Sequence, residues 1–220
     1  MRHFSYINGE FCAELVPLRQ IAEAVGTPCY VYSKATLEHH YNALKNALKN
    51  TNTRIAFAVK ANTNRAVINV LGNLGAGADT VSEGEIRRAL NAGISADKIV
   101  FSGVGKTRAE LEFAVKTKIY QINIESSQEL ETLSQVAINL GMVQDVVFRV
   151  NPDVAAGGHE KISTGYAQSK FGISIEKCFA LFEHAKSLKG IRALGLAVHI
   201  GSQISKIEPF EKAYKALAQM

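Results

Sequence analysis

Residues 55–60 read Ile-Ala-Phe-Ala-Val-Lys, an apolar run of strand length that ends on a lysine. A strand that is apolar on both faces is typical of the inner sheet of an α/β protein. Charged side chains are seldom buried without a partner, and burial favours the neutral amine of a lysine. A neutral amine is a nucleophile that forms Schiff bases with carbonyl compounds. Lys60 is therefore a candidate catalytic residue, although a lysine at a strand end can also simply extend into solvent.

Strand and helix patterns alternate along the chain on both sides of this stretch. Strands are expected at residues 29–32, 55–59, 77–81, 98–102, 119–124, 145–150 and 193–200. Amphipathic helices are expected at residues 15–25, 33–49, 64–74, 83–91, 107–116, 126–140, 175–188 and 209–220. This alternation indicates βαβ units around a parallel sheet. Because no nucleotide-binding glycine fingerprint is present, the pattern favours a TIM-type (β/α)8 barrel over a doubly wound sheet.

The number of units falls short of a closed barrel. Six strands are expected from the one that ends at Lys60 to the one at residues 193–200, whereas a TIM barrel has eight strands and about 250 residues. We therefore expect an incomplete barrel of about six βα units, truncated at its C-terminus. Residues 1–32 are predicted to form an N-terminal segment that leads into a partial barrel domain at residues 33–220. A smaller open α/β sheet, complete as it stands, is the alternative.

Composition narrows the class of protein. Of 220 residues, 47% are hydrophobic and 20% charged, which is typical of a globular domain rather than a disordered chain. The net charge of +5 is scattered, so no nucleic-acid partner is expected, and no stretch is apolar enough to span a membrane. The three cysteines, Cys12, Cys29 and Cys178, have no C-x-x-C spacing, which argues against a metal site or disulfide framework and favours a cytoplasmic protein.

The C-terminal ends of barrel strands carry the chemistry in this fold. Near these positions lie Lys60, Asp79, Arg149, His199 and Ser202, together with several glycines. This set is suited to an anionic, planar ligand that bears a carbonyl group. Each residue also has an ordinary structural interpretation: His199 as a core histidine bonded to a carbonyl, Arg149 as the partner of a neighbouring carboxylate, and Asp79 as a loop cap.

Two further stretches invite a functional interpretation. Gly105-Lys106-Thr107 ends like a phosphate-binding P-loop, but Val100 stands where the first glycine of that motif is required. We therefore interpret it as a turn and helix start. His159, beside Gly157 and Gly158, is interpreted as a loop residue, with a substrate-closing loop as the alternative.

Eight stretches together resemble the diaminopimelate decarboxylase family of fold type III pyridoxal-phosphate enzymes, in order and with similar spacing. They are F-A-V-K-A-N (57–62), G-A-D-T-V-S-E-G-E-I (77–86), S-G-V-G-K-T (102–107), N-I-E-S (123–126), R-V-N-P-D-V (149–154), H-E-K-I-S-T-G (159–165), K-F-G-I (170–173) and H-I-G-S-Q-I (199–204). Single stretches are shared with ornithine and arginine decarboxylases, whereas the 149–154 stretch and the 162–173 segment favour the diaminopimelate enzymes.

The resemblance implies roles for the candidate residues. Lys60 would carry pyridoxal 5'-phosphate, His199 would stack on its ring, Ser202 would help to hold its phosphate, and Asp79 and Arg149 would line the pocket. The implied reaction is decarboxylation of meso-2,6-diaminopimelate to L-lysine, by a homodimer when full length.

This sequence also departs from the family pattern. Glu83 replaces a common glycine, which we expect to be tolerated. The chain ends before the family's glycine-rich phosphate loop, its E-P-G-R segment and its C-terminal β-domain, so this piece alone is expected to be inactive. The alternatives are a related ornithine, arginine or carboxynorspermidine decarboxylase, and a non-catalytic pyridoxal-phosphate-binding protein.

Overall fold

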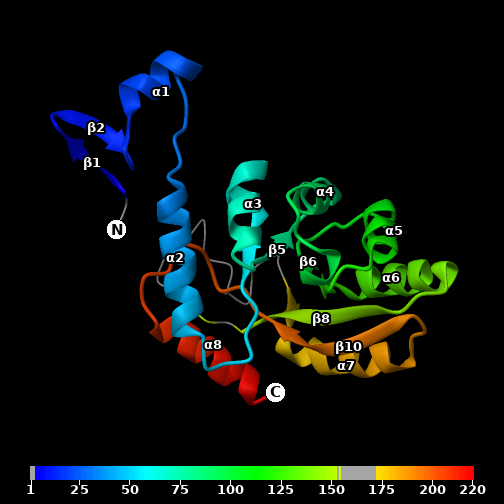
Figure 1. The fold of residues 1–220 in the computed structure, drawn as a ribbon. Coiled ribbons are helices and arrows are strands. Elements are labelled where there is room, and N and C mark those ends of the chain that lie inside the picture. Colours follow the sequence, from blue (N-terminus) through cyan, green and yellow to red (C-terminus); the bar gives the residue numbers. More distant parts are fainter. Residues whose placement is uncertain (1–2, 153, 155–171) are drawn as a thin grey trace.

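The computed structural model describes residues 3–152, 154 and 172–220, so His159 and most of its loop lie outside the described residues. Six parallel strands follow one another across the main sheet in the order in which they occur in the chain (Figure 1). They are β4 (Ala56–Ala58), β5 (Gly77–Thr80), β6 (Ile99–Phe101), β7 (Gln121–Ile124), β8 (Gln144–Asn151) and β10 (Ile191–Ala197). This sequential order is that of a barrel, since a doubly wound sheet reverses its strand order.

The sheet is an open arc in the described part of the chain. Its first strand, β4, pairs only with β5, and its last strand, β10, pairs only with β8. A two-residue strand, β9 (Ile173–Ser174), pairs with the end of β8. The predicted fold class, an incomplete parallel α/β barrel with six strands, is confirmed.

A helix follows each of the six strands, in several cases after a very short loop, and α2 (Lys34–Ala47) comes directly before the first of them. The helices after the strands are α3 (Arg65–Asn73), α4 (Glu83–Asn91), α5 (Arg108–Thr117), α6 (Ser127–Leu140), α7 (Ile175–Ser187) and α8 (Glu208–Ala218), with 3-10 turns η1 (Val59–Ala61) and η2 (Ala96–Lys98). The side chains of Ser82, Thr107 and Ser126 cap α4, α5 and α6 by accepting a backbone N–H bond from the third residue of each helix. These caps satisfy helix-end donors and fix where each helix leaves its strand.

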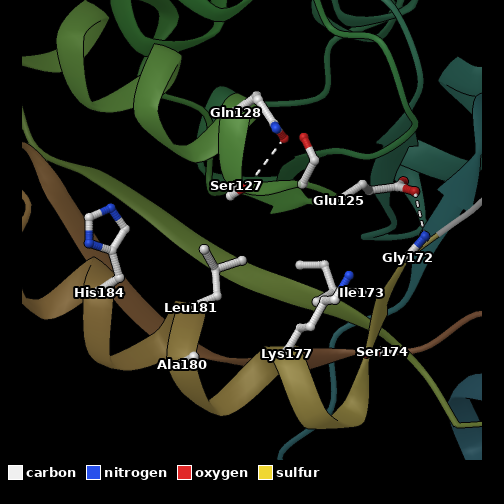
Figure 2. A pocket seen from close by; sticks show the side chains of 11 residues that line it. Glu125, Ser127, Gln128, Gly172, Ile173, Ser174, Lys177, Ala180, Leu181 and His184 are labelled. Atoms are coloured by element: carbon white, nitrogen blue, oxygen red, sulfur yellow. Dashed lines mark hydrogen bonds between the residues drawn. The ribbon is translucent and has the colours of Figure 1, made fainter.

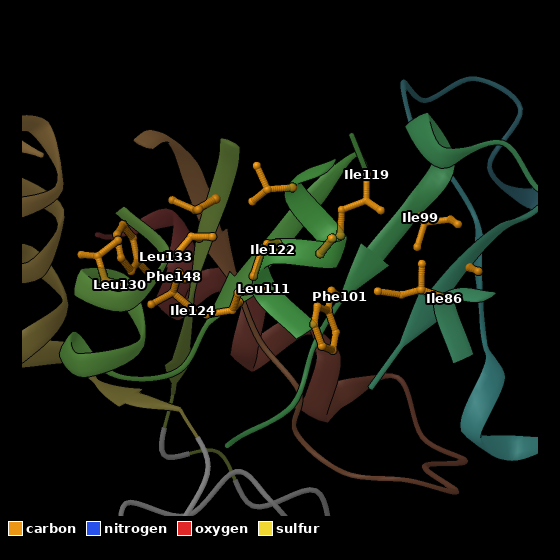
Figure 3. Packing of buried hydrophobic residues seen from close by; sticks show 14 of the residues in the cluster. Ile86, Ile99, Phe101, Leu111, Ile119, Ile122, Ile124, Leu130, Leu133 and Phe148 are labelled. Carbon is orange, nitrogen blue, oxygen red and sulfur yellow. The ribbon is translucent and has the colours of Figure 1, made fainter. Parts of the chain in front are cut away.

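One face of the sheet packs against the helices and forms the core (Figure 3). Alternate strand residues point to this face and are at most 1% exposed. They are Ala78, Ile99, Phe101, Ile122, Ile124, Val146, Phe148 and Val150. They contact apolar residues of α3 to α7, among them Ile68, Ile86, Leu111, Leu130 and Leu181. Burial of this face supplies the main driving force for the domain.

The strand residues between them point to the opposite face, which we call the inner face. Here the chain places Asp79, Gln121, Asn123, Asp145 and Arg149, all of them only partly buried. Because side chains alternate along a strand, burying the apolar set necessarily brings these polar residues to one surface. The inner face is therefore the place where chemistry is possible.

The N-terminal region forms a small sheet of its own, which the sequence analysis missed. Its strands are β1 (Phe4–Ile7), β2 (Glu10–Ala13) and β3 (Val16–Pro17), followed by α1 (Leu18–Val25). Asn8 and Gly9 connect β1 to β2 with φ angles of 51° and 86°, the signature of a type I′ hairpin turn. The strand predicted at residues 29–32 is wrong, because this stretch is an irregular link that pairs with no described strand.

The division at residue 33 stays a prediction. Among the described residues, no helix has the length and apolar character needed to cross a membrane.

An Ile→Ala substitution is expected to cost more stability on the buried face of the sheet than on an exposed helix surface. Ile122→Ala removes a fully buried side chain of β7 and leaves a cavity in the core, so we expect the free energy of unfolding to fall by about 2–5 kcal/mol. The control, Ile138→Ala, truncates a side chain on α6 that is 43% exposed and should change it by about 0.5 kcal/mol or less. Urea denaturation monitored by circular dichroism measures both, and equal losses would contradict this account of the core.

Candidate active site

Lys60 lies in η1, the single 3-10 turn that directly follows β4. The strand therefore delivers it to the carboxyl edge of the sheet, as predicted. Its side chain is exposed, however, whereas the neighbouring Val59 is fully buried. The expectation that the strand itself desolvates Lys60 is wrong, because the turn directs Val59 rather than Lys60 into the core. The amine is accessible to a ligand from the inner face.

His199 follows β10, at the far edge of the sheet from Lys60, and brings the predicted residues into one electrostatic group. Its pKa lies below the ordinary histidine value, first because the ring is partly buried, and then because Arg149 and Lys60 are both positively charged nearby. Asp79 and Glu125 oppose this shift. Three of the other four predicted site residues thus lie within electrostatic reach of His199 across the arc. The imidazole is favoured in its neutral form.

Asp79 is held in place by a chain of side-chain hydrogen bonds along the inner face. The hydroxyl of Ser102 donates to Asp79 Oδ1 at 2.6 Å. The amide of Asn123 donates to the same Ser102 oxygen at 2.9 Å, and the amide of Gln121 donates to Asn123 Oδ1 at 2.9 Å. These bonds cross from β7 to β5, so three consecutive strands fix the position of one carboxylate.

Arg149 forms an ion pair with Glu125, as its structural alternative anticipated. Arg149 Nη1 donates to Glu125 Oε1 at 2.8 Å, and the two side chains are only 11% and 1% exposed. The same carboxylate accepts backbone N–H bonds from Gly103 at 2.9 Å and Gly172 at 3.3 Å. A buried carboxylate with these three donors is well satisfied. It therefore orients the guanidinium at the edge of the site.

Ser202 stands apart from the other four residues. It lies exposed in the turn between β10 and α8, where Gly201 and Gln203 have φ angles of 144° and 57°. Within the part of the chain that the structure describes, no hydrogen bond joins it to Lys60, Asp79, Arg149 or His199. Its predicted role in holding a phosphate stays a prediction.

A pocket of about 550 Å³ opens next to this group, between the start of α6 and the side of α7 (Figure 2). It is lined by Glu125, Ser126, Ser127, Gln128, Gly172, Ile173, Ser174, Lys177, Ala180, Leu181 and His184. Glu125 is the residue that it shares with the site, since its carboxylate reaches both Gly172 and Arg149. The pocket includes none of the five predicted residues, so it flanks the candidate site.

Sequence reasoning assigned no role to Glu125, Ser102 or Lys106. Glu125 lies in the segment 123–126, which the strand-end rule selects and which is one of the eight stretches of the resemblance, but neither signal assigned it a role. The interpretation of Gly105-Lys106-Thr107 as a turn and helix start is confirmed, because Thr107 forms a capping box with Glu110. Within the described ranges, no group of three or more His, Cys, Asp or Glu side chains is placed to hold a metal ion.

The burial of Glu125 predicts a large cost for removing its partner. Arg149→Met leaves a carboxylate that is 1% exposed without its counter-ion, so we expect the free energy of unfolding to fall by about 3–5 kcal/mol. Arg192→Met, which breaks an exposed pair with Asp145, is the control and should cost about 1 kcal/mol or less. Chemical denaturation at neutral pH compares the two. A loss for Arg149→Met no larger than for the control would contradict the inferred burial.

The lowered pKa of His199 predicts a pH dependence of stability. Since the folded state holds this imidazole neutral, the unfolded chain binds more protons below the ordinary pKa of about 6.5. Stability should therefore fall as the pH drops from 6.5 through the folded pKa. His199→Gln should lose less stability over that range than the parent does. Unfolding free energies at pH 7.5 and 5 measure this, and parallel losses in the two proteins would refute it.

Comparison with known proteins identifies the family of the chain. Residues 34–220 match the family model of the pyridoxal binding domain of pyridoxal-dependent decarboxylases. The diaminopimelate decarboxylase of Pseudomonas aeruginosa is 48% identical over 99% of this chain, and that of Haemophilus influenzae is 43% identical over 96%. The chain spans about half the length of these relatives, 52% and 51% respectively.

Solved structures show the same likeness in three dimensions. Diaminopimelate decarboxylase from Helicobacter pylori, complexed with L-lysine, superposes with a TM-score of 0.89 at 37% identity, over 92% of this chain and 51% of that one. The enzyme from M. jannaschii gives a TM-score of 0.89 at 33% identity, over 98% and 52% of the two chains. The chain therefore belongs to the family of the pyridoxal binding domain of pyridoxal-dependent decarboxylases.

Proposed function

We propose that the full-length protein is a pyridoxal-phosphate-dependent carboxy-lyase that converts meso-2,6-diaminopimelate to L-lysine and carbon dioxide. The observation that carries the proposal is the position of Lys60, Asp79, Arg149 and His199 at or just after the carboxyl ends of β4, β5, β8 and β10, from which the first three act electrostatically on the His199 ring. The identity of 48% to a diaminopimelate decarboxylase along nearly the whole chain supports the choice of substrate.

The residues present fit pyridoxal phosphate by their chemistry. An accessible primary amine on Lys60 is the group that can hold an aldehyde covalently. His199, favoured in its neutral form, presents a flat ring that can cover an aromatic cofactor without adding charge. When bound, the cofactor supplies a ring that withdraws electrons as the substrate loses its carboxylate.

The other side chains orient and shape the site. The carboxylate of Glu125 holds Arg149 in position, so its positive charge is available to an anionic group without a change of rotamer. Ser102 donates to Asp79 and orients its carboxylate. Ser202 would contribute a hydroxyl to the phosphate from its exposed turn.

We propose that the full-length enzyme is a cytoplasmic homodimer acting on a free amino acid. The resemblance to the diaminopimelate decarboxylases supports this assembly, and the scattered charge of the chain favours a small-molecule substrate over nucleic acid. The remainder of the active site would come from the portion of the relatives that this chain does not span.

The proposal predicts which amino acid the enzyme prefers and how much activity is lost when Lys60 is replaced. The full-length gene product, loaded with pyridoxal phosphate, should release carbon dioxide from meso-diaminopimelate with a larger kcat/KM than from ornithine or arginine. Lys60→Ala should lower kcat at least about 100-fold, because the amine that holds the cofactor is lost. The control, Lys34→Ala, removes an exposed lysine at the start of α2 and should leave turnover unchanged.

Carbon dioxide release is measured for each amino acid with parent and variant proteins. A preference for ornithine or arginine would contradict the proposed substrate. Cofactor binding without turnover on any of the three would contradict the proposed activity.

A further inference from the structure

Lys106, the lysine of Gly105-Lys106-Thr107, is buried under the inner face with its side chain only 1% exposed. Its ammonium donates to Gly103 O at 2.6 Å, to Asn123 O at 2.8 Å and to Glu129 Oε1 at 2.7 Å. An ammonium has three N–H donors, and here each has an acceptor. The amine is thus fully engaged inside the protein and does not face a phosphate.

Its acceptors lie on two neighbouring βα units, one in the loop after β6 and two on either side of the loop after β7. Gly103 belongs to the loop between β6 and α5, whereas Asn123 and Glu129 belong to β7 and the first turn of α6. Glu129 is 6% exposed in its side chain, and burial raises its pKa while Lys106 lowers it. A buried lysine that binds two backbone carbonyls and one carboxylate therefore fixes the two loops to each other.

Hydrogen bonds connect both of these chain segments to residues of the candidate site. The side chain of Asn123 donates to Ser102, which donates to Asp79. The backbone N–H of Gly103 donates to Glu125, which accepts from Arg149. One ammonium is consequently three contacts away from each of two predicted site residues, Asp79 and Arg149, by two separate routes.

We propose that Lys106 is a positioning residue that fixes the loops after β6 and β7 to each other and thereby holds Asp79 and Arg149 at the candidate site. Ser102 and Asn123 transmit this placement to Asp79, and Gly103 and Glu125 transmit it to Arg149. The expected effect of Lys106 on cofactor binding rests on the proposed function. Its expected effect on the mobility of the two loops is independent of that function.

The test replaces the ion pair by neutral side chains. Lys106→Met alone would leave Glu129 as an unpaired buried charge, so the informative variant is Lys106→Met/Glu129→Gln in the full-length protein. The introduced glutamine keeps an oxygen for the backbone N–H of Glu125, which bonds the native carboxylate. The matched control is Lys116→Met/Glu112→Gln, the same change at a pair on α5 that is 57% and 44% exposed.

Three quantities are measured: the melting temperature, the pyridoxal phosphate dissociation constant by absorbance titration, and hydrogen exchange of peptides covering residues 102–106 and 123–126 in the cofactor-free protein. For the buried-pair variant we expect at least tenfold weaker cofactor binding and at least tenfold faster exchange in both loops, at a temperature where the protein is folded. The control should match the parent in binding and exchange.

Parent-like exchange in the two loops would overturn the proposal, whether or not the melting temperature falls, because Lys106 would then be a purely stabilising residue. Parent-like cofactor affinity together with faster exchange would also overturn it, since the loops would not control the site. If the parent itself binds no pyridoxal phosphate, the proposed function fails, and loop exchange alone then decides the role of Lys106.

If the buried-pair variant does not fold, Ser102→Ala decides the proposal, because it breaks the route to Asp79 and leaves Lys106 in place. We expect an unchanged melting temperature with a dissociation constant at least tenfold higher and a raised KM at little-changed kcat. Parent-like binding by Ser102→Ala would overturn the proposal.

Discussion

The parallel pairing of β4 to β10, with one strand face buried against helices, is the constraint on which the site depends. Phe101, Ile122 and Phe148 are fully buried on the helix face, and the period of two then assigns their neighbours to the inner face. Since all six strands run in the same direction, their carboxyl ends meet at one edge. Residues from all six strand ends are assembled there by the same burial that stabilises the fold.

This constraint also explains which polar groups are buried. Glu125 and Lys106 come just after strand ends, where the chain turns from the sheet into a helix. Each is paired and hydrogen-bonded, as buried charges must be. Their partners, Glu129 in α6 and Arg149 in β8, belong to the next βα unit, so the ion pairs connect neighbouring units near the carboxyl ends of the strands. These two ion pairs thus hold in place the chain segments that surround the site.

Much of the fold was predictable because the local signals are strong. Buried strands such as the one at 99–101 are apolar and short, and Ser82, Thr107 and Ser126 mark helix starts by a hydroxyl three residues before a glutamate. The N-terminal hairpin was missed because its strands have only four residues each, although Asn8-Gly9 is a turn signal. The strand expected at residues 29–32 followed β propensity alone, and propensity does not supply a pairing partner.

The site was predictable only in part, for a related reason. The strand-end rule selects Lys60, Asp79, Arg149 and His199 from position alone, and the structure places the first three within electrostatic reach of His199. The ion pair of Arg149 with Glu125 joins residues 24 apart in the chain, and the bond of Lys106 to Glu129 spans 23. No local pattern encodes such a contact. Likewise, the exposure of Lys60 depends on the turn after β4 rather than on the apolar strand before it.

The most direct test of the account is to reduce the cofactor-loaded, full-length protein with borohydride and to locate the attached pyridoxyl group by peptide mass spectrometry. The account predicts modification of Lys60, whose amine is accessible, and none of Lys106, whose three N–H donors are engaged. A pyridoxyl group on Lys106 or on another lysine, with Lys60 unmodified, would contradict it.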